Sequence, residues 1–181
     1  CHKVPSAQFE TELLTVNDIV DQWELLLDRL SEFNSELKVV FTVSPVRHWK
    51  DGAHGNQVSK SVLFLALEEL MKHKSMPGYF PAYELLMDDL RDYRFYSDDM
   101  LHPSSSAVEY IWEKFTGAYF DTDTVNIRNE ILKVIRACNH RFITDSPMGK
   151  KAFAEKMLKQ ISEIELKNAR IDLTTEKDYF R

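Results

Sequence analysis

The stretch DMLHPS at residues 99–104 places an aspartate three residues before a histidine. On a tight turn or a first helical turn, this spacing puts the side chains of Asp99 and His102 on the same side. The carboxylate can then hold one ring N–H, fix the tautomer, and stabilise the imidazolium formed when the other nitrogen takes a proton. These are two of the three groups of a Ser-His-Asp hydrolase. The structural alternative is that Asp99 caps a helix beginning near Pro103.

Three further candidates follow the most strand-like run of the chain, the mostly apolar and β-branched residues 37–43. Ser44 precedes Pro45, which cannot continue a central strand. Open α/β sheets bind ligands at the carboxyl ends of their strands, so Ser44, Arg47 and His48 are candidate substrate-binding residues. Arg47 and His48 suit an anionic or polar substrate group, and an ordinary solvated loop is the alternative. Ser44 lacks the Gly-x-Ser-x-Gly surroundings of a nucleophile.

A metal site is not expected. The side chains that could be imagined as ligands match no zinc-binding spacing; they are His48, His54, Asp98, Asp99 and His102. We therefore predict that the chain uses no metal and no cofactor.

The elements that must position these residues follow from hydrophobic periodicity. Thr15 and Asp18 resemble a capping box. The pattern predicts helices over 16–33, 57–73 and 103–115, strands over 37–43 and 78–81, and helix and loop over 84–96. Helix, buried strand, helix and short strand are typical of a doubly wound α/β fold. We expect part of a three-layer, flavodoxin-like parallel sheet, whose strand at 37–43 is covered on both faces.

After residue 117 the pattern is helical only. Two long helices are predicted, over 123–140 and 147–169, as an α-helical C-terminal extension. Two parallel strands alone leave an exposed edge and an incomplete core. The missing strands are expected either upstream of Cys1 or from another chain. Self-association through the exposed sheet edge or the C-terminal helices is the corresponding expectation.

Amino-acid composition and net charge exclude some classes of binding partner. The 181 residues are 44% hydrophobic and 29% charged, with a net charge of −6. An acidic chain offers no electrostatic attraction for a phosphate backbone, so nucleic acid is not an expected partner. No apolar run is long enough to span a bilayer, and two cysteines make no disulfide framework. A chain that begins with Cys is expected to be a piece of a longer protein, so the compartment stays open, with the cytoplasm slightly favoured.

Five segments together resemble the GSCFA domain family. They are CHKVP (1–5), TVSPVRH (42–48), MDDLRDYRFY (87–96), DMLHPS (99–104) and YIWEKF (110–115). That family is similar to the SGNH (GDSL-like) hydrolases, which are three-layer α/β proteins with a nucleophilic serine near the N-terminus and an Asp-x-x-His pair near the C-terminus. The resemblance implies that residues 1–116 are the C-terminal portion of such a domain and that residues 117–181 are an extension. It also implies that His2 and Lys3 lie near the rim of the crevice.

Carried over to this sequence, the resemblance makes Asp99 the orienting acid and His102 the general base. The implied function is serine ester hydrolysis on a small-molecule or carbohydrate ester. The Gly-Ser-Cys-Phe-Ala segment that would carry the nucleophile is absent from the sequence. These residues alone are therefore expected to be inactive, with the serine supplied upstream. The alternative is a non-catalytic binding or scaffold protein of the same fold.

Overall fold

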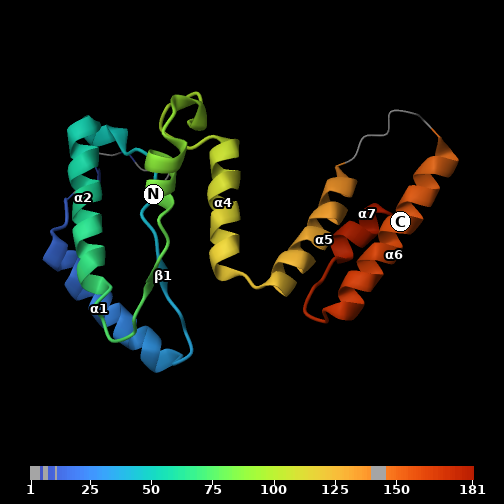
Figure 1. The fold of residues 1–181 in the computed structure, drawn as a ribbon, viewed down its shortest axis with the longest axis horizontal. Helices are drawn as coiled ribbons and strands as arrows, with labels where there is room; N and C mark the ends of the chain where they lie inside the picture. The colour runs from blue at the N-terminus through green and yellow to red at the C-terminus, as the bar shows by residue number, and fades with distance from the viewer. Residues whose placement is uncertain (1–4, 6–7, 11, 140–145) are drawn as a thin grey trace. The chain divides into compact units, whose positions relative to one another are not determined.

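A computed structural model describes residues 5, 8–10, 12–139 and 146–181 (Figure 1). The chain divides into two compact units, unit 1 (residues 1–115) and unit 2 (residues 116–181). His2 and Lys3, which the family resemblance placed near the site, lie outside the described residues. All of the other candidate residues belong to unit 1.

Unit 1 consists of helices around a very short sheet (Figure 1). Its elements in chain order are α1 (Val16–Phe33), β1 (Val40–Phe41), η2 (Trp49–Asp51), α2 (Gly52–Leu70), β2 (Gly78–Tyr79), α3 (Ala82–Glu84), the π-helix η3 (Leu85–Leu90), η4 (Tyr93–Phe95) and α4 (Ser105–Tyr119). Helix α4 continues past the end of unit 1 into unit 2.

The first helix begins where the sequence predicted. The Thr15 hydroxyl accepts the backbone N–H of Asp18 at 3.2 Å, and the Asp18 carboxylate accepts the backbone N–H of Thr15 at 2.8 Å. This reciprocal capping box satisfies two N–H groups that would otherwise lack partners at the helix start. One side of α1 faces the strands and α2: Leu27 is buried, and the Trp23 ring meets the Phe41 ring edge-on at 4.9 Å.

The expected three-layer α/β sheet is wrong. Helices make up 67% of the structure, and the sheet described has two parallel strands of two residues each. Val40 pairs with Gly78 and Phe41 with Tyr79, and the long helix α2 connects the two strands. The apolar run at 37–43 has a high strand propensity, but a strand extends only as far as its backbone finds partners. Here the ladder bonds run from Gly78 N–H to Val39 O and from Phe80 N–H to Phe41 O.

The expectation that this run is covered on both faces is also wrong. Phe41 packs on Trp23, and Val43 is 2% exposed. On the opposite face, Val40 is 38% exposed and Thr42 is exposed as well. One face of the short sheet is therefore packed against α1 and α2, and the other is open.

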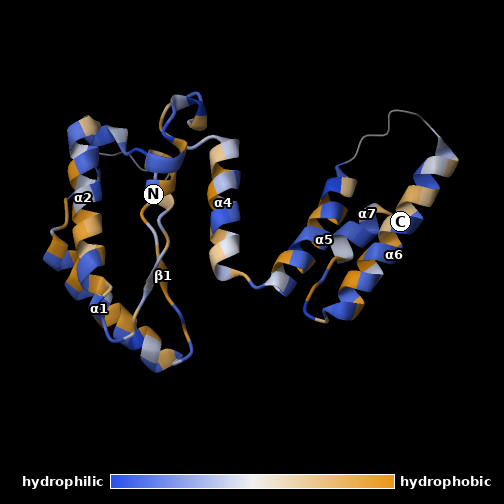
Figure 2. Ribbon diagram, viewed as in Figure 1, coloured by the Kyte–Doolittle hydropathy of each residue, from blue (hydrophilic) through white to orange (hydrophobic). Residues whose placement is uncertain are grey.

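Unit 2 is described as a small helical cluster with its own core. The two predicted helices are present as α5 (Thr122–Cys138) and α6 (Pro147–Lys167), and the sequence reading missed a third, α7 (Thr174–Tyr179). Apolar and polar residues alternate along α5 and α6 with helical spacing (Figure 2). Their apolar sides form a core with the end of the chain; its buried members are Val134, Ala137, Met157, Ile161, Ile164, Leu173 and Phe180.

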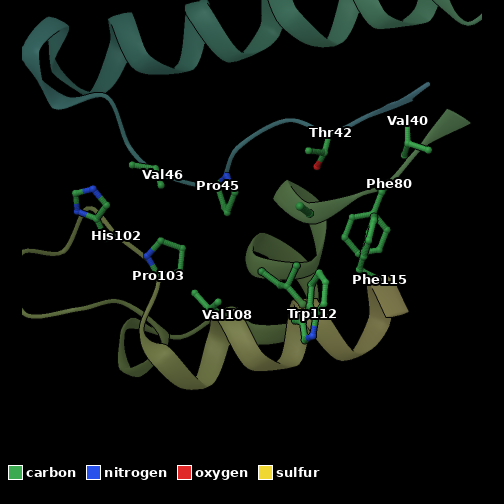
Figure 3. Close-up of a pocket in the computed structure, with 12 residues that line it drawn as sticks. Val40, Thr42, Pro45, Val46, Phe80, His102, Pro103, Val108, Trp112 and Phe115 are labelled. Carbon is green, nitrogen blue, oxygen red and sulfur yellow. The ribbon is translucent and has the colours of Figure 1, made fainter. Parts of the chain in front are cut away.

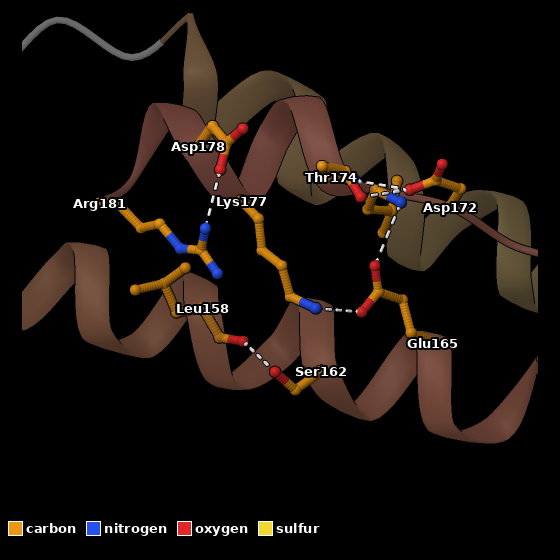
Figure 4. Close-up of polar contacts among 9 residues, drawn as sticks. Leu158, Ser162, Glu165, Asp172, Thr174, Lys177, Asp178 and Arg181 are labelled. Carbon is orange, nitrogen blue, oxygen red and sulfur yellow. Dashed lines mark hydrogen bonds and ion pairs between the residues drawn. The ribbon is translucent and has the colours of Figure 1, made fainter.

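Polar contacts hold α7 against α6 (Figure 4). The carboxylate of Glu165 on α6 forms an ion pair with the Lys177 ammonium on α7 and accepts the backbone N–H of Leu173 at 3.2 Å. The hydrogen bond from Lys177, followed by the one from Leu173, lowers the pKa of the Glu165 carboxyl. One side chain thus anchors both the start and the middle of the terminal segment.

Truncation of a buried and of an exposed residue on α6 tests which side of this helix forms the core of unit 2. Ile161 on α6 is 0% exposed, whereas Leu166 on the same helix is 88% exposed. Ile161→Ala should lower the free energy of unfolding by about 2 to 4 kcal/mol, because it removes buried methyl groups and leaves a cavity. Leu166→Ala should change it by less than about 0.5 kcal/mol. Denaturant titration followed by circular dichroism measures both, and equal losses would contradict the core assignment.

Candidate functional site

A narrow loop carries Asp99 and His102. Its base is closed by two backbone hydrogen bonds, from Ser104 N–H to Phe95 O and from Ser97 N–H to His102 O, each 2.8 Å long. An antiparallel bridge joins Tyr96 to Pro103 between them. Residues 98–101 are left at the tip, and α4 begins just after the loop, at Ser105. The loop is therefore fixed at its base by backbone pairing and by the helix that follows it.

Asp99 and His102 make the contact that their spacing predicts. Asp99 Oδ2 lies 2.6 Å from His102 Nδ1. An ionised carboxylate can only accept hydrogen bonds, so Nδ1 carries the proton and Nε2 of the neutral ring has a free lone pair. Nε2 has no hydrogen-bond partner within the described part of the chain. The imidazole is thus in the tautomer that can accept a proton at Nε2.

The second oxygen of Asp99 is bound by the backbone. Asp99 Oδ1 accepts the N–H of Leu101 at 2.8 Å and the N–H of His102 at 3.0 Å. These backbone bonds, first that of His102 and then that of Leu101, lower the pKa of the Asp99 carboxyl to about 2, with a further contribution from the imidazole. The carboxylate therefore stays ionised at neutral pH.

Met100, between the two residues, has a strained backbone. Its φ is 57°, in the left-handed region that non-glycine residues rarely adopt. This conformation turns the chain tightly enough for the Asp99 side chain to reach the N–H groups of the two following peptides. Strained residues of this kind are concentrated at functional sites.

His102 lies at one end of an apolar hollow between the β1 segment and α4 (Figure 3). The hollow has a volume of about 720 Å³, and besides the His102 ring its walls include Val40, Thr42, Pro45, Val46, Phe80, Val108, Trp112 and Phe115. The open face of the short sheet forms one wall. An exposed apolar surface of this kind marks a place that a ligand or another polypeptide segment covers.

The loop after β1 is tied to α2. The Ser44 carbonyl accepts a hydrogen bond of 2.5 Å from the ammonium of Lys60, a residue only 8% exposed. Burial lowers the pKa of the Lys60 ammonium. The Ser44 hydroxyl accepts the N–H of Val46 at 3.2 Å, so it stabilises its own turn and makes no contact with His102. Asn56 holds the other end of the loop by accepting the backbone N–H of His48 at 2.8 Å.

Arg47 joins this loop to the loop of His102. Its backbone N–H donates to Leu101 O at 3.1 Å, and its Nη1 donates to Met100 O at 3.3 Å. The guanidinium carbon lies 4.3 Å from the centroid of the Tyr96 ring. Arg47 thus contacts the backbone of the tip between Asp99 and His102, a contact that the sequence analysis did not predict. Substrate binding by Arg47, His48 and Ser44 stays a prediction.

Two other histidines pair with aspartates, in different surroundings. His48 Nδ1 lies 3.0 Å from Asp51 Oδ2, and both side chains are more than half exposed. His73 Nε2 lies 3.2 Å from Asp28 Oδ1, and its Nδ1 accepts the backbone N–H of Ser75, so both of its nitrogens are occupied. Neither histidine lines the hollow.

The sequence did not predict the His48–Asp51 pair or several residues that hold the site in place. The His-x-x-Asp spacing of His48 and Asp51 was a visible signal that could have found that pair. Lys60, Asn56 and Tyr96 act through contacts across the fold and carry no local pattern. Within the described ranges, no three His, Cys, Asp or Glu side chains are grouped so as to hold a metal ion. No helix in that same part of the chain is both long and apolar enough to cross a membrane.

The family model described as the GSCFA family matches residues 1–115. The chain belongs to the GSCFA family. The match ends where unit 1 ends, so the GSCFA portion contains the Asp99–His102 loop, the hollow and the Arg47 loop, and unit 2 lies beyond it. No curated protein and no solved structure matches the chain.

Acid titration tests the backbone anchoring of Asp99 in the GSCFA portion. A carboxyl whose pKa is lowered on folding stabilises the fold above its unfolded value of about 3.9. That stability is lost as the pH falls toward the folded pKa of about 2. Asp99→Asn should therefore flatten the pH dependence of unfolding between those values. Carboxyl ¹³C shifts give the pKa directly, and an Asp99 that titrates near the ordinary value would contradict the anchoring.

The left-handed backbone at Met100 gives a second prediction. Met100→Val should destabilise unit 1 by about 1 to 2 kcal/mol, because a β-branched side chain is disfavoured at positive φ. Met100→Asn is the matched control and should be neutral or slightly stabilising, since asparagine tolerates this conformation. Tryptophan fluorescence follows unit 1 selectively, because Trp23, Trp49 and Trp112 all belong to it. Equal stabilities of the two variants would contradict the assigned strain.

Proposed function

We propose that the GSCFA portion of this chain supplies the acid–base half of an SGNH-type serine ester hydrolase. The observation that carries the proposal is the 2.6 Å contact of Asp99 Oδ2 with His102 Nδ1, which leaves Nε2 without a partner at the edge of the hollow. Membership of the GSCFA family and the resemblance of that family to the SGNH hydrolases support it. The substrate class is a small-molecule or carbohydrate ester.

The proton transfers follow from the tautomer of His102. Nε2 takes the hydroxyl proton of a serine while the serine oxygen attacks the ester carbonyl, and Asp99 stabilises the imidazolium that results. The tetrahedral intermediate collapses when Nε2 returns the proton to the departing alcohol oxygen. Water then gives a proton to Nε2 and attacks the acyl-serine carbonyl. The proton returns to the serine oxygen as the carboxylic acid is released. Asp99 stays ionised throughout, because its backbone partners keep its pKa near 2.

The proposal requires a serine hydroxyl from outside the described residues. Ser44, the serine nearest in sequence to the β1 end, accepts the N–H of Val46 with its hydroxyl. The apolar hollow beside His102 would lie next to the reacting centre. Its walls suit the hydrocarbon part of an ester or the apolar residues that carry the serine.

A non-catalytic binding or scaffold role is the second candidate. It is favoured by one observation: within the part of the chain that the structure describes, no hydroxyl contacts His102 Nε2. A binding module would keep the fold and hold its ligand without turnover. Assays that compare ligand binding with ester hydrolysis in the same preparation distinguish the two.

The decisive variant is His102→Ala in the intact protein. Turnover of p-nitrophenyl acetate and of an acetylated sugar should fall by at least about a thousandfold, because members of a triad act as a unit. His54→Ala is the control, since His54 is also an exposed histidine of unit 1 and does not line the hollow. The control should keep its activity. Turnover that survives in His102→Ala would exclude this residue as the general base.

A further inference from the structure

Two peptide groups lie between Arg47 and Asp99. The peptide joining Met100 to Leu101 donates its N–H to Asp99 Oδ1, and its carbonyl oxygen accepts from Arg47 Nη1. The peptide joining Leu101 to His102 donates its N–H to the same Oδ1, and its carbonyl oxygen accepts the backbone N–H of Arg47. Both peptides are therefore bound at their two ends by the same pair of residues.

This arrangement links a cation to an anion through the backbone. A guanidinium at one end of a peptide group and a carboxylate at the other polarise it in the same direction, and hydrogen bonds in such a chain strengthen one another. The two N–H groups involved are the ones that most lower the pKa of Asp99. Hydrogen bonds of Arg47 to the carbonyls thus fix the orientation of the peptides that hold the carboxylate.

Other contacts fix the side chain of Arg47 and the loop that carries it. Its guanidinium carbon lies 4.3 Å from the ring centroid of Tyr96 and 5.7 Å from that of Tyr93, within reach of cation–π attraction. No carboxylate pairs with it within the described residues. On either side of Arg47, the loop is anchored to α2 through Lys60 and Asn56.

We propose that Arg47 is a positioning residue for His102: it orients the two tip peptides, these fix the Asp99 carboxylate, and the carboxylate fixes the imidazole tautomer. The role differs from the substrate contact that the sequence suggested for Arg47. Its meaning for catalysis rests on the proposed ester hydrolase function, whereas the structural coupling does not.

Nuclear magnetic resonance of the full chain tests the coupling without any substrate. Arg47→Met removes the guanidinium and keeps the backbone N–H. It should raise the pKa of Asp99 by about one unit, because the carboxylate loses oriented donors. At alkaline pH, the imidazole ¹⁵N shifts of His102 should move from the Nδ1–H tautomer toward a mixture of tautomers. Arg47→Lys keeps the charge but not the planar fork, so intermediate values are expected.

Arg94→Met is the matched control. Arg94 is an exposed arginine on η4, close to the base of the Asp99–His102 loop, and it pairs with Asp92 at 3.0 Å. The variant should leave Asp99 and His102 unchanged, and the His73 ring serves as an internal reference in every variant. A folded Arg47→Met chain in which Asp99 and His102 are as in the unmodified protein would overturn the proposal. If Arg47→Met does not fold, unchanged values in Arg47→Lys would overturn it equally.

Kinetics of the intact protein separate this inference from the proposed function. A positioning role predicts that Arg47→Met lowers kcat about tenfold to a hundredfold at nearly constant KM, since a small displacement of the base is costly. A raised KM with constant kcat would instead identify a substrate contact and overturn the positioning role. An unmodified protein without esterase activity, combined with the expected resonance changes, would refute the hydrolase and leave the coupling established.

Discussion

The candidate site depends on how the Asp99 carboxylate is satisfied. It accepts three N–H groups, two from the backbone and one from the His102 ring, in a loop exposed to solvent. An exposed carboxylate bound to one imidazole alone would be free to rotate and to bind water. The two peptide donors remove that freedom, and the imidazole takes the oxygen that remains. The left-handed backbone of Met100 is the local conformation that makes this possible.

The loop does not achieve this geometry alone. Its carbonyl groups are held by Arg47, more than fifty positions earlier in the chain, and the segment of Arg47 is tied to α2 by a buried ammonium and by an asparagine amide oxygen. Lys60 is more than nine-tenths buried, so its hydrogen bond to the Ser44 carbonyl offsets part of the cost of removing the cation from water. The helical scaffold of unit 1 thus determines where the β1 loop lies, and that loop restrains the tip of the next.

The sequence allowed local features to be predicted but not the architecture. The Asp-x-x-His contact and the Thr15 capping box are confirmed, because three-residue spacings place side chains together whatever surrounds them. The three-layer sheet was wrong because strand pairing is non-local: an apolar run such as 37–43 looks the same with one paired edge as with two. The contacts of Arg47 with the Met100 and Leu101 carbonyls could not be predicted, since nothing in its neighbours along the chain shows that these two distant carbonyls lie within its reach. Helix α7 was missed because it is only six residues long, too short for a clear periodicity.

The open face of β1 determines the thermodynamics of binding for any molecule that covers it. The walls beside Val40, Val108 and Trp112 are almost free of charge, so an occupant displaces water from hydrocarbon and aromatic surface. Such association is accompanied by a decrease in heat capacity and responds weakly to ionic strength. Calorimetry at several temperatures and salt concentrations would therefore detect binding in this hollow by its heat-capacity change, even before the ligand is identified.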